Sequence, residues 1–391
     1  MKKIFFGLFI FAVFLHILFY VSALKTHTLD ILFDGGIPGQ DFFQIPNAAR
    51  SFLLGGNLQG FLSDGLRNPY IDCCAANVNV YHPFFTLLIG VPLQYFKPWT
   101  SYYIWEGVHV LTTIILIYFI YSRFKENKYL YLGLSLFLLN AFHYYEIRNS
   151  QFHFLFNFFS FFLIYESVKK GDSVKGGIFF FLSLLAKPIG LLWIIPLLIY
   201  KHFKTIFVGL LLFLAVSVPF YYSDIGKYYF SNFYYVSTTS IPSDNLLNFL
   251  WFFPQYHILI ENIVKYFMYG TFIFFFYLQL FKKASLFIVF FLWTSFQLLF
   301  YNLVFHYHFT ILGLLFCLGI LLGEFKIKKD ELIPMIFLTI PSPFFLYNLG
   351  FTSRIGLLFN EATWSLWSDF WLIFLITAVC MRILKEKTIN A

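Results

Sequence analysis

Residues 4–21 read IFFGLFIFAVFLHILFYV and follow Lys2 and Lys3. An α-helix rises about 1.5 Å per residue and the bilayer core is about 30 Å thick, so roughly 20 apolar residues cross it. The following Val21-Ser22-Ala23 resembles a signal-peptidase site, which leaves a cleaved leader as the alternative. Because this run exceeds the apolar region of about 7–15 residues in signal peptides, we interpret it as a retained membrane helix.

The composition extends this interpretation to the whole chain. Of its 391 residues, 60% are hydrophobic and only 12% are charged, whereas a soluble domain is typically about 25% charged. Lipid must therefore solvate most of the surface, and every spanning backbone must be helical. With no internal repeat and no low-complexity linker, residues 1–391 are expected to form one all-α polytopic domain, a bundle of about 10–12 membrane helices.

The net charge of +8 comes from short basic clusters between apolar runs, which indicates topology rather than nucleic-acid binding. The four cysteines have no metal-binding spacing and are expected to be packing residues. Ten predicted spans lie near residues 4–23, 101–122, 129–145, 152–168, 205–222, 257–281, 285–301, 309–323, 332–348 and 365–381. If all the basic clusters are cytoplasmic, residues 24–80, 146–151, 223–256, 302–308 and 349–364 lie outside.

Two apolar segments do not fit simple spans. A full crossing by residues 81–96 would invert everything downstream, so we expect a half-inserted or interfacial helix there. Residues 176–200 have basic clusters at both ends and Lys187-Pro188 in the middle. Since proline breaks a helix, this segment is expected to be a re-entrant hairpin whose tip borders a cavity.

The long first outer loop, residues 24–80, carries the first candidate group. Glycines and Pro38 place Asp41 on a turn just before an amphipathic helix whose expected apolar face includes Ala48-Ala49 and Phe52-Leu53. A carboxylate there can act as a general base toward a hydroxyl nucleophile. The alternatives are an N-terminal helix cap and a solvated loop residue.

Cations and imidazoles form the next candidates. Lys187 lies inside an apolar segment, where an ionisable group is costly, so it is expected either to bind a lipid phosphate or to extend to the interface. His306 and His308 lie at the outer end of a span. Two positions apart on a helix they do not share a face, so they predict a single phosphate donor rather than a metal pair.

A further polar group, from Glu146 through Arg148 to Gln151, lies at an outer helix boundary. Arg148 is expected to bind a carboxylate or phosphate, or to pair only with Glu146. The sequence has no phosphate-binding glycine loop, no nucleophile elbow and no pair of aspartates for a nucleotide-sugar metal. A lipid-linked donor would supply an outer site that cytoplasmic nucleotides do not reach.

The order of these motifs resembles glycosyltransferase family 87, the polyprenyl-phosphate-mannose-dependent mannosyltransferases of the GT-C superfamily. The similar segments, in order over residues 30–320, are Asp41-Phe42, Ala48-Ala49-Arg50 with Gly55-Gly56-Asn57, Tyr81-His82-Pro83-Phe84-Phe85, Arg148-Asn149-Ser150-Gln151, Gly176-Gly177 through Ala186-Lys187-Pro188, and Phe305 to His308. His82 and Ser150 depart from the family pattern. Asn302 and Phe305 also depart, which leaves the choice between His306 and His308 open.

The resemblance implies an inverting transfer of a hexose, mannose by family precedent, to a glycolipid or glycan hydroxyl. Asp41 would be the base, Lys187 and His308 would hold the donor phosphate, and His306, Arg50, Arg148 and Gln151 would be further substrate contacts. A multi-pass protein of the inner (plasma) membrane with an extracytoplasmic site is implied, with no metal and no cofactor. A transporter or lipid flippase and a polysaccharide polymerase or ligase remain alternatives.

Overall fold

The structure of the chain is a computed structural model that describes residues 2–33, 38–56, 79, 81–222, 246, 254–282, 284–301, 304, 306–342 and 361–386. Its helices are α1 (Lys2–Val21), the π-helix η1 (Ser22–Thr26), α2 (Gln40–Leu53), α4 (Pro83–Leu93), α5 (Pro98–Phe124), α6 (Leu130–Leu138), α7 (Phe142–Asn149), α8 (His153–Lys170), α9 (Val174–Ala186), the 3-10 helix η2 (Pro188–Trp193), α10 (Ile194–Ile199), α11 (Phe203–Tyr221), the 3-10 helix η4 (Pro254–Tyr256), α14 (His257–Leu280), α15 (Leu286–Phe300), the 3-10 helix η5 (His306–Phe309), α16 (Thr310–Leu322), α17 (Lys329–Thr339) and α20 (Glu361–Glu386).

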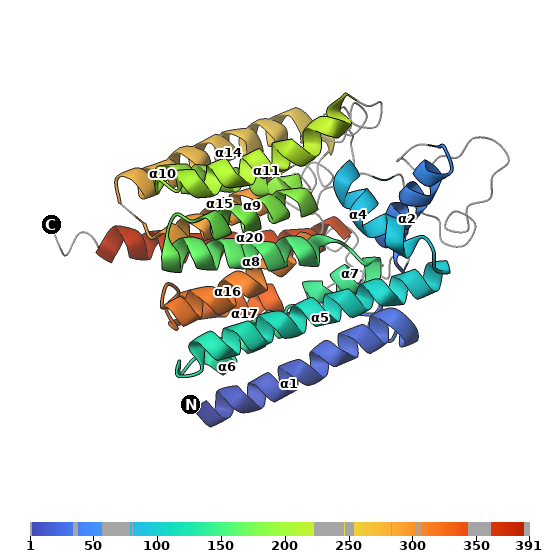
Figure 1. The fold of residues 1–391 in the computed structure, drawn as a ribbon. Coiled ribbons are helices and arrows are strands. Elements are labelled where there is room, and N and C mark those ends of the chain that lie inside the picture. The colour runs from blue at the N-terminus through green and yellow to red at the C-terminus, as the bar shows by residue number, and fades with distance from the viewer. Residues whose placement is uncertain are drawn as a thin grey trace.

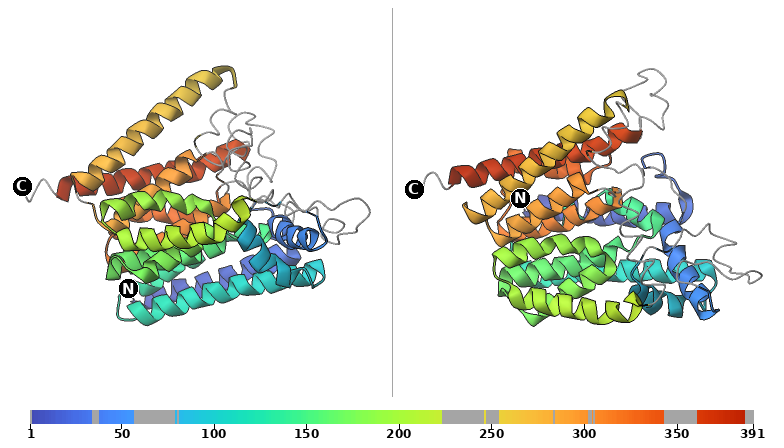
Figure 2. Two further views of the ribbon diagram at one scale, coloured as in Figure 1. Left: turned by 45° about the horizontal axis from the view of Figure 1, so that its top comes forward. Right: turned by 90° about the horizontal axis from the view of Figure 1, so that it is seen from above.

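All the regular secondary structure in the described residues is helical, which confirms the predicted all-α polytopic membrane fold. Among the described residues, five segments are long and apolar enough to cross a membrane: α1 with η1, α5, α11, most of α14 and most of α20. Most helices run along one common direction, while α2 and α4 form a separate group at one end (Figures 1 and 2). The start of α1 lies at the opposite end.

The predicted span at residues 129–145 is not one continuous helix. Asn140 interrupts it between α6 and α7, where its Oδ1 accepts a hydrogen bond from the backbone of Phe142 at 3.1 Å. Its Nδ2 donates to the carbonyl oxygens of Phe309 and Thr310, at 3.3 and 3.2 Å. An asparagine side chain that bonds to backbone groups in this way competes with helix formation.

The remaining expectations for spans agree with the helices to within a few residues, except near residues 332–348. There α17 ends at Thr339, and residues 343–348 lie outside the described part of the chain. Residues 57–78 of the expected outer segment 24–80 also lie outside it, as do most or all of the expected outer segments 223–256 and 349–364. The segment at 81–96 forms α4, whose 11 residues are about 16 Å long and too short to cross a bilayer.

The helices α2 and α4 approach closely at Gly90. A Cβ atom built on Gly90 would lie 2.6 Å from the Cβ of Ala49 and 2.7 Å from the carbonyl oxygen of Ile45. Both atoms belong to α2, so only glycine allows this approach. The buried face of α2 includes Ala48 and Ala49, whereas Phe52 and Leu53 of the expected apolar face lie exposed on the surface.

We predict that Gly90→Ala lowers thermal stability in detergent because the added methyl group forces α2 away from α4. Overpacking of this kind typically costs about 1–3 kcal/mol. The matched control is Gly107→Ala in the interior of α5, where a Cβ meets no atom within 4 Å. Equal unfolding temperatures for the two variants, measured by tryptophan fluorescence, would contradict the close packing.

Candidate active site

Asp41 is held at the start of α2 by an unusual backbone. Gly39 adopts a left-handed conformation with φ of 70°, and a Cβ there would lie 2.8 Å from the ring of Tyr102. The amide of Gly39 donates to the carbonyl oxygen of Arg148 at 3.0 Å, which ties α2 to α7. Asp41 is therefore in the first turn of α2 and not, as expected from sequence, on a preceding turn.

The Asp41 carboxylate accepts hydrogen bonds from two glutamines. Gln151 Nε2 donates to Oδ2, and Gln44 Nε2 donates to Oδ1 at 3.4 Å. The Tyr81 hydroxyl in turn donates to Gln151 Oε1 at 3.2 Å. Burial raises the pKa of Tyr81 well above its ordinary value, and the charge of Asp41 adds to this effect, so Tyr81 remains a neutral donor.

Lys187 lies where the chain changes from α9 to η2. Its backbone is extended, with φ of −151° and ψ of 122°, because α9 ends at Ala186 and Pro188 begins the 3-10 helix. The Nζ atom lies 3.3 Å from His308 Nε2 and 4.6 Å from the ring centroid of Tyr307. Since a lysine ammonium only donates, His308 Nε2 is the acceptor in this pair.

The residues around Asp41 and those around Lys187 interact electrostatically. The Tyr81 hydroxyl is within electrostatic range of both Asp41 and Tyr307, and the Lys187 ammonium is within range of the Asp41 carboxylate. We call Asp41, Tyr81, Gln151, Lys187, Tyr307 and His308 the outer polar cluster. Asp41 and Lys187 both keep part of their surface exposed, as groups that contact a substrate require.

Each member of the outer polar cluster comes from a helix end or a break. Asp41 begins α2 and Tyr81 precedes α4, whereas Lys187 separates α9 from η2. Gln151 joins α7 to α8, and the other two belong to η5 just before α16. Breaks in five separate segments thus place a carboxylate and a lysine ammonium within electrostatic range of each other.

The other candidates lie around this cluster with different partners. Arg148 donates to the carbonyl oxygen of Ala23 at 3.2 Å and to Asp30 Oδ2 at 3.3 Å, so it ties η1 and the following loop to α7. His306 stacks on Tyr145 with ring centroids 4.9 Å apart. Arg50, half-buried, lies in the last turn of α2.

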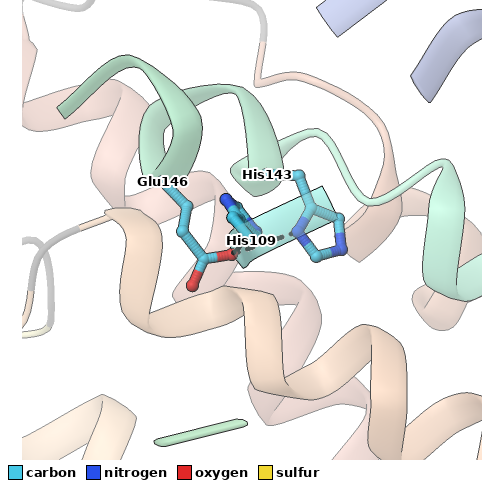
Figure 3. A group of neighbouring side chains, drawn as sticks. All are labelled: His109, His143 and Glu146. Atoms are coloured by element: carbon cyan, nitrogen blue, oxygen red, sulfur yellow. Dashed lines mark hydrogen bonds and ion pairs between the residues drawn. The ribbon is translucent and has the colours of Figure 1, made fainter. Parts of the chain in front are cut away.

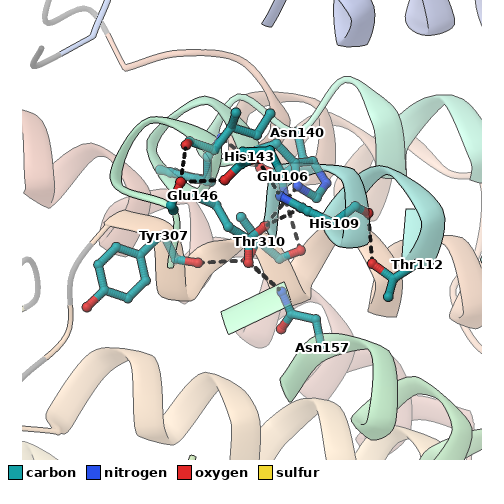
Figure 4. Close-up of polar contacts among 12 residues, drawn as sticks. Glu106, His109, Thr112, Asn140, His143, Glu146, Asn157, Tyr307 and Thr310 are labelled. Atoms are coloured by element: carbon teal, nitrogen blue, oxygen red, sulfur yellow. Dashed lines mark hydrogen bonds and ion pairs between the residues drawn. The ribbon is translucent and has the colours of Figure 1, made fainter. Parts of the chain in front are cut away.

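Glu146 does not pair with Arg148, which was one sequence-based expectation. It instead faces two histidines inside the bundle: Oε2 lies 3.1 Å from His143 Nδ1 and 3.8 Å from His109 Nε2. The polar contacts of this second group extend through Thr310 to Asn157 and are drawn in Figure 4. This second group touches the outer polar cluster through the Thr310 hydroxyl, which donates to the carbonyl oxygen of Tyr307.

Sequence reasoning missed Tyr307, Gln44 and the His109–His143 pair, and it did not assign a role to Tyr81. Tyr307 was visible between two candidate histidines, and Gln44 lies three residues after Asp41, the spacing of neighbours on a helix. His109 and His143 each lie three residues from a glutamate, Glu106 and Glu146, a spacing that was visible in the sequence. That the two pairs meet depends on the packing of α5 against α7, which no local pattern reveals.

The family model of glycosyltransferase family 87 matches residues 79–251 of this chain, a little under half of its length. This match shows that the segment is similar to glycosyltransferase family 87. The matched segment contains Tyr81, Gln151 and Lys187, whereas Asp41 and His308 lie outside it and join the site through the fold. A search of curated proteins gives no match. The family match and the candidate membrane spans together indicate a membrane glycosyltransferase.

We predict that Gln151→Ala lowers the rate of sugar transfer by about 10- to 100-fold, because Asp41 loses a charge-assisted hydrogen bond of about 1.5–3 kcal/mol. As a positioning residue, Gln151 should also affect the pH–rate profile of transfer. Gln255→Ala, at an exposed position in η4, is the control. An unchanged rate and profile for Gln151→Ala would exclude this positioning role.

Proposed function

We propose that this membrane glycosyltransferase moves a hexose, in the first instance mannose, from a polyprenyl-phosphate-linked donor to a hydroxyl group of a glycolipid or glycan. The observation that carries the proposal is the outer polar cluster, in which a carboxylate and a lysine ammonium lie within electrostatic range. A displacement at an anomeric carbon next to a phosphate uses one group of each kind.

Asp41 is the proposed general base. As the acceptor hydroxyl attacks the anomeric carbon, its O–H bond breaks and the proton passes to the Asp41 carboxylate. The Gln151 and Gln44 amides hold the two carboxylate oxygens in place, which supports this role because a base must be oriented toward its proton. Attack from the face opposite the phosphate inverts the configuration of the anomeric carbon.

Lys187 is the proposed partner of the leaving phosphate. The bond between the anomeric carbon and the phosphate oxygen breaks, and its electron pair stays on the phosphate. An ammonium next to that oxygen stabilises the developing charge, so no general acid is needed. His308 accepts from Lys187, so we assign it the role of orienting the lysine and not that of a second cation.

The distribution of basic residues supports an extracytoplasmic location for this site. Lys2 and Lys3 begin α1, Arg123 lies in the last turn of α5, and Lys169 and Lys170 lie in the last turn of α8. The positive-inside rule assigns such clusters to the cytoplasm. The start of α1 and the α2–α4 pair lie at opposite ends of the molecule (Figure 1). We therefore propose a plasma-membrane enzyme that uses its donor on the outer side.

We predict that Asp41→Asn lowers transfer from a labelled polyprenyl-phosphate sugar by about 10²–10⁴-fold, the usual effect of removing a general base. The amide keeps the size of the side chain, so folding should be retained. Asp330→Asn, in the exposed first turn of α17, is the matched control. Full activity of Asp41→Asn in isolated membranes would refute the assignment of the base.

Lys187→Gln should reduce kcat/KM for the lipid-linked donor by about 10- to 100-fold, as expected when one charge-assisted contact to phosphate is lost. Lys187→Arg should recover part of this loss, and Lys204→Gln in the exposed first turn of α11 should have no effect. Donor kinetics that Lys187→Gln leaves unchanged would show that the phosphate binds elsewhere.

A further inference from the structure

Two glutamates and two histidines form a buried group between α5 and α7. Glu106 and His109 belong to α5, while His143 and Glu146 belong to α7, and none of the four is more than 3% exposed. Figure 3 shows the two imidazoles and the Glu146 carboxylate facing one another. Ionisable groups buried this deeply need compensation for the loss of their hydration.

The positions of three donor atoms match a metal site. His143 Nδ1 lies 3.1 Å and His109 Nε2 lies 3.8 Å from Glu146 Oε2, and all three atoms are within 4.8 Å of one another. Ligands about 2.0–2.1 Å from a tetrahedral Zn²⁺ ion are about 3.3 Å apart. The His109–Glu146 distance and the 4.8 Å limit for the set exceed this spacing, so the His109 ring would move toward the other two ligands by about an ångström when an ion binds.

The opposite nitrogen of each ring also faces an acceptor. His143 Nε2 lies 3.2 Å from the carbonyl oxygen of Phe137, and His109 Nδ1 lies 3.5 Å from Glu106 Oε2. In metal sites, the ring nitrogen that does not bind the ion usually donates to a carbonyl or a carboxylate. His143 has this arrangement, and His109 Nδ1 faces the Glu106 carboxylate at a distance too long for a hydrogen bond in this structure.

The glutamates of this group also have supporting contacts at the oxygens that do not face the histidines. The second oxygen of Glu146 lies 3.5 Å from both Asn157 Nδ2 and Thr310 Oγ1. A Ser150 hydroxyl donates to Glu106 Oε1, so one oxygen of each carboxylate has hydrogen-bonding neighbours and the other faces the histidines. Such supporting contacts fix the ligands of a metal ion.

A count of protons shows that two neutral rings cannot by themselves satisfy all the contacts of this group, which needs either further protons or a cation. The four ring nitrogens of His109 and His143 all face oxygen acceptors, but a neutral imidazole has only one N–H. Glu106 Oε2 and His109 Nδ1 are fully buried and form no hydrogen bond. Lys187 is within electrostatic range of Glu146 but bonds to His308. A divalent cation would satisfy both rings in their neutral form.

We propose that His109 Nε2, His143 Nδ1 and Glu146 Oε2 bind one divalent transition-metal ion, with Zn²⁺ best suited to two imidazoles and a carboxylate. The ion would be structural and would join the middle of α5 to α7. Because α7 leads directly to Gln151, this joint would also fix the segment that orients Asp41. The inference is independent of the proposed sugar transfer.

The test uses the full chain, purified in detergent with a tag that contains no histidine. After chelator treatment, Zn²⁺ alone is added, excess is removed, and bound metal is measured by mass spectrometry. We expect about one ion per wild-type chain and about a tenfold or greater loss in His143→Ala and Glu146→Gln. His202→Gln, a buried histidine between α10 and α11, is the matched control.

Two further measurements guard against misfolded variants. Bound Zn²⁺ should raise the unfolding temperature of the wild type and of His202→Gln, but not that of Glu146→Gln. Co²⁺ added to the metal-free wild type should give visible absorption bands from imidazole and carboxylate coordination. A folded wild type that takes up no metal would show that protons hold the group together, and uptake unchanged in both ligand variants would place the ion elsewhere.

Discussion

A backbone that leaves the helical conformation at membrane depth must find new partners for its amide and carbonyl groups. This requirement organises the site end of the bundle. At the break between α6 and α7, Asn140 supplies those partners by bonding to Phe142 and to carbonyl groups of the η5–α16 junction. The start of α2 uses the carbonyl of Arg148 in the same way. The interrupted helices therefore stabilise one another through these hydrogen bonds. The outer polar cluster and the buried glutamate–histidine group both include residues at or next to these interruptions.

Much of the fold follows from the sequence because long apolar runs have only one stable conformation in lipid. The boundaries of α1, α5, α11, α14 and α15 lie within a few residues of the runs that predict them. The break at Asn140 was missed because its cause is tertiary: the side chain bonds to residues about 170 positions away. The first turn of α2 was also missed, since the left-handed conformation of Gly39 depends on packing against Tyr102.

The candidate site was partly accessible from sequence. An aspartate in an outer loop and a lysine within an apolar segment are unusual, and the structure brings Asp41 and Lys187 within electrostatic range. The sequence could not show which candidates stabilise the fold. Arg148 and Gln151 lie three residues apart, yet the first binds Ala23 and Asp30 while the second binds Asp41. The pairing of His109 with His143 depends on how α5 crosses α7, which no local pattern encodes.

The length of α9 has a consequence for the lipid around it. Its 13 residues are about 20 Å long, and Ile178 is exposed on its surface. The neighbouring hydrocarbon is about 30 Å thick, and a bilayer thins beside a helix that is too short for it. Such local thinning would lower the headgroup layer toward Lys187 at the end of α9. The short length of α9 relative to the bilayer would then reduce how far a charged lipid headgroup must move into the membrane to reach Lys187.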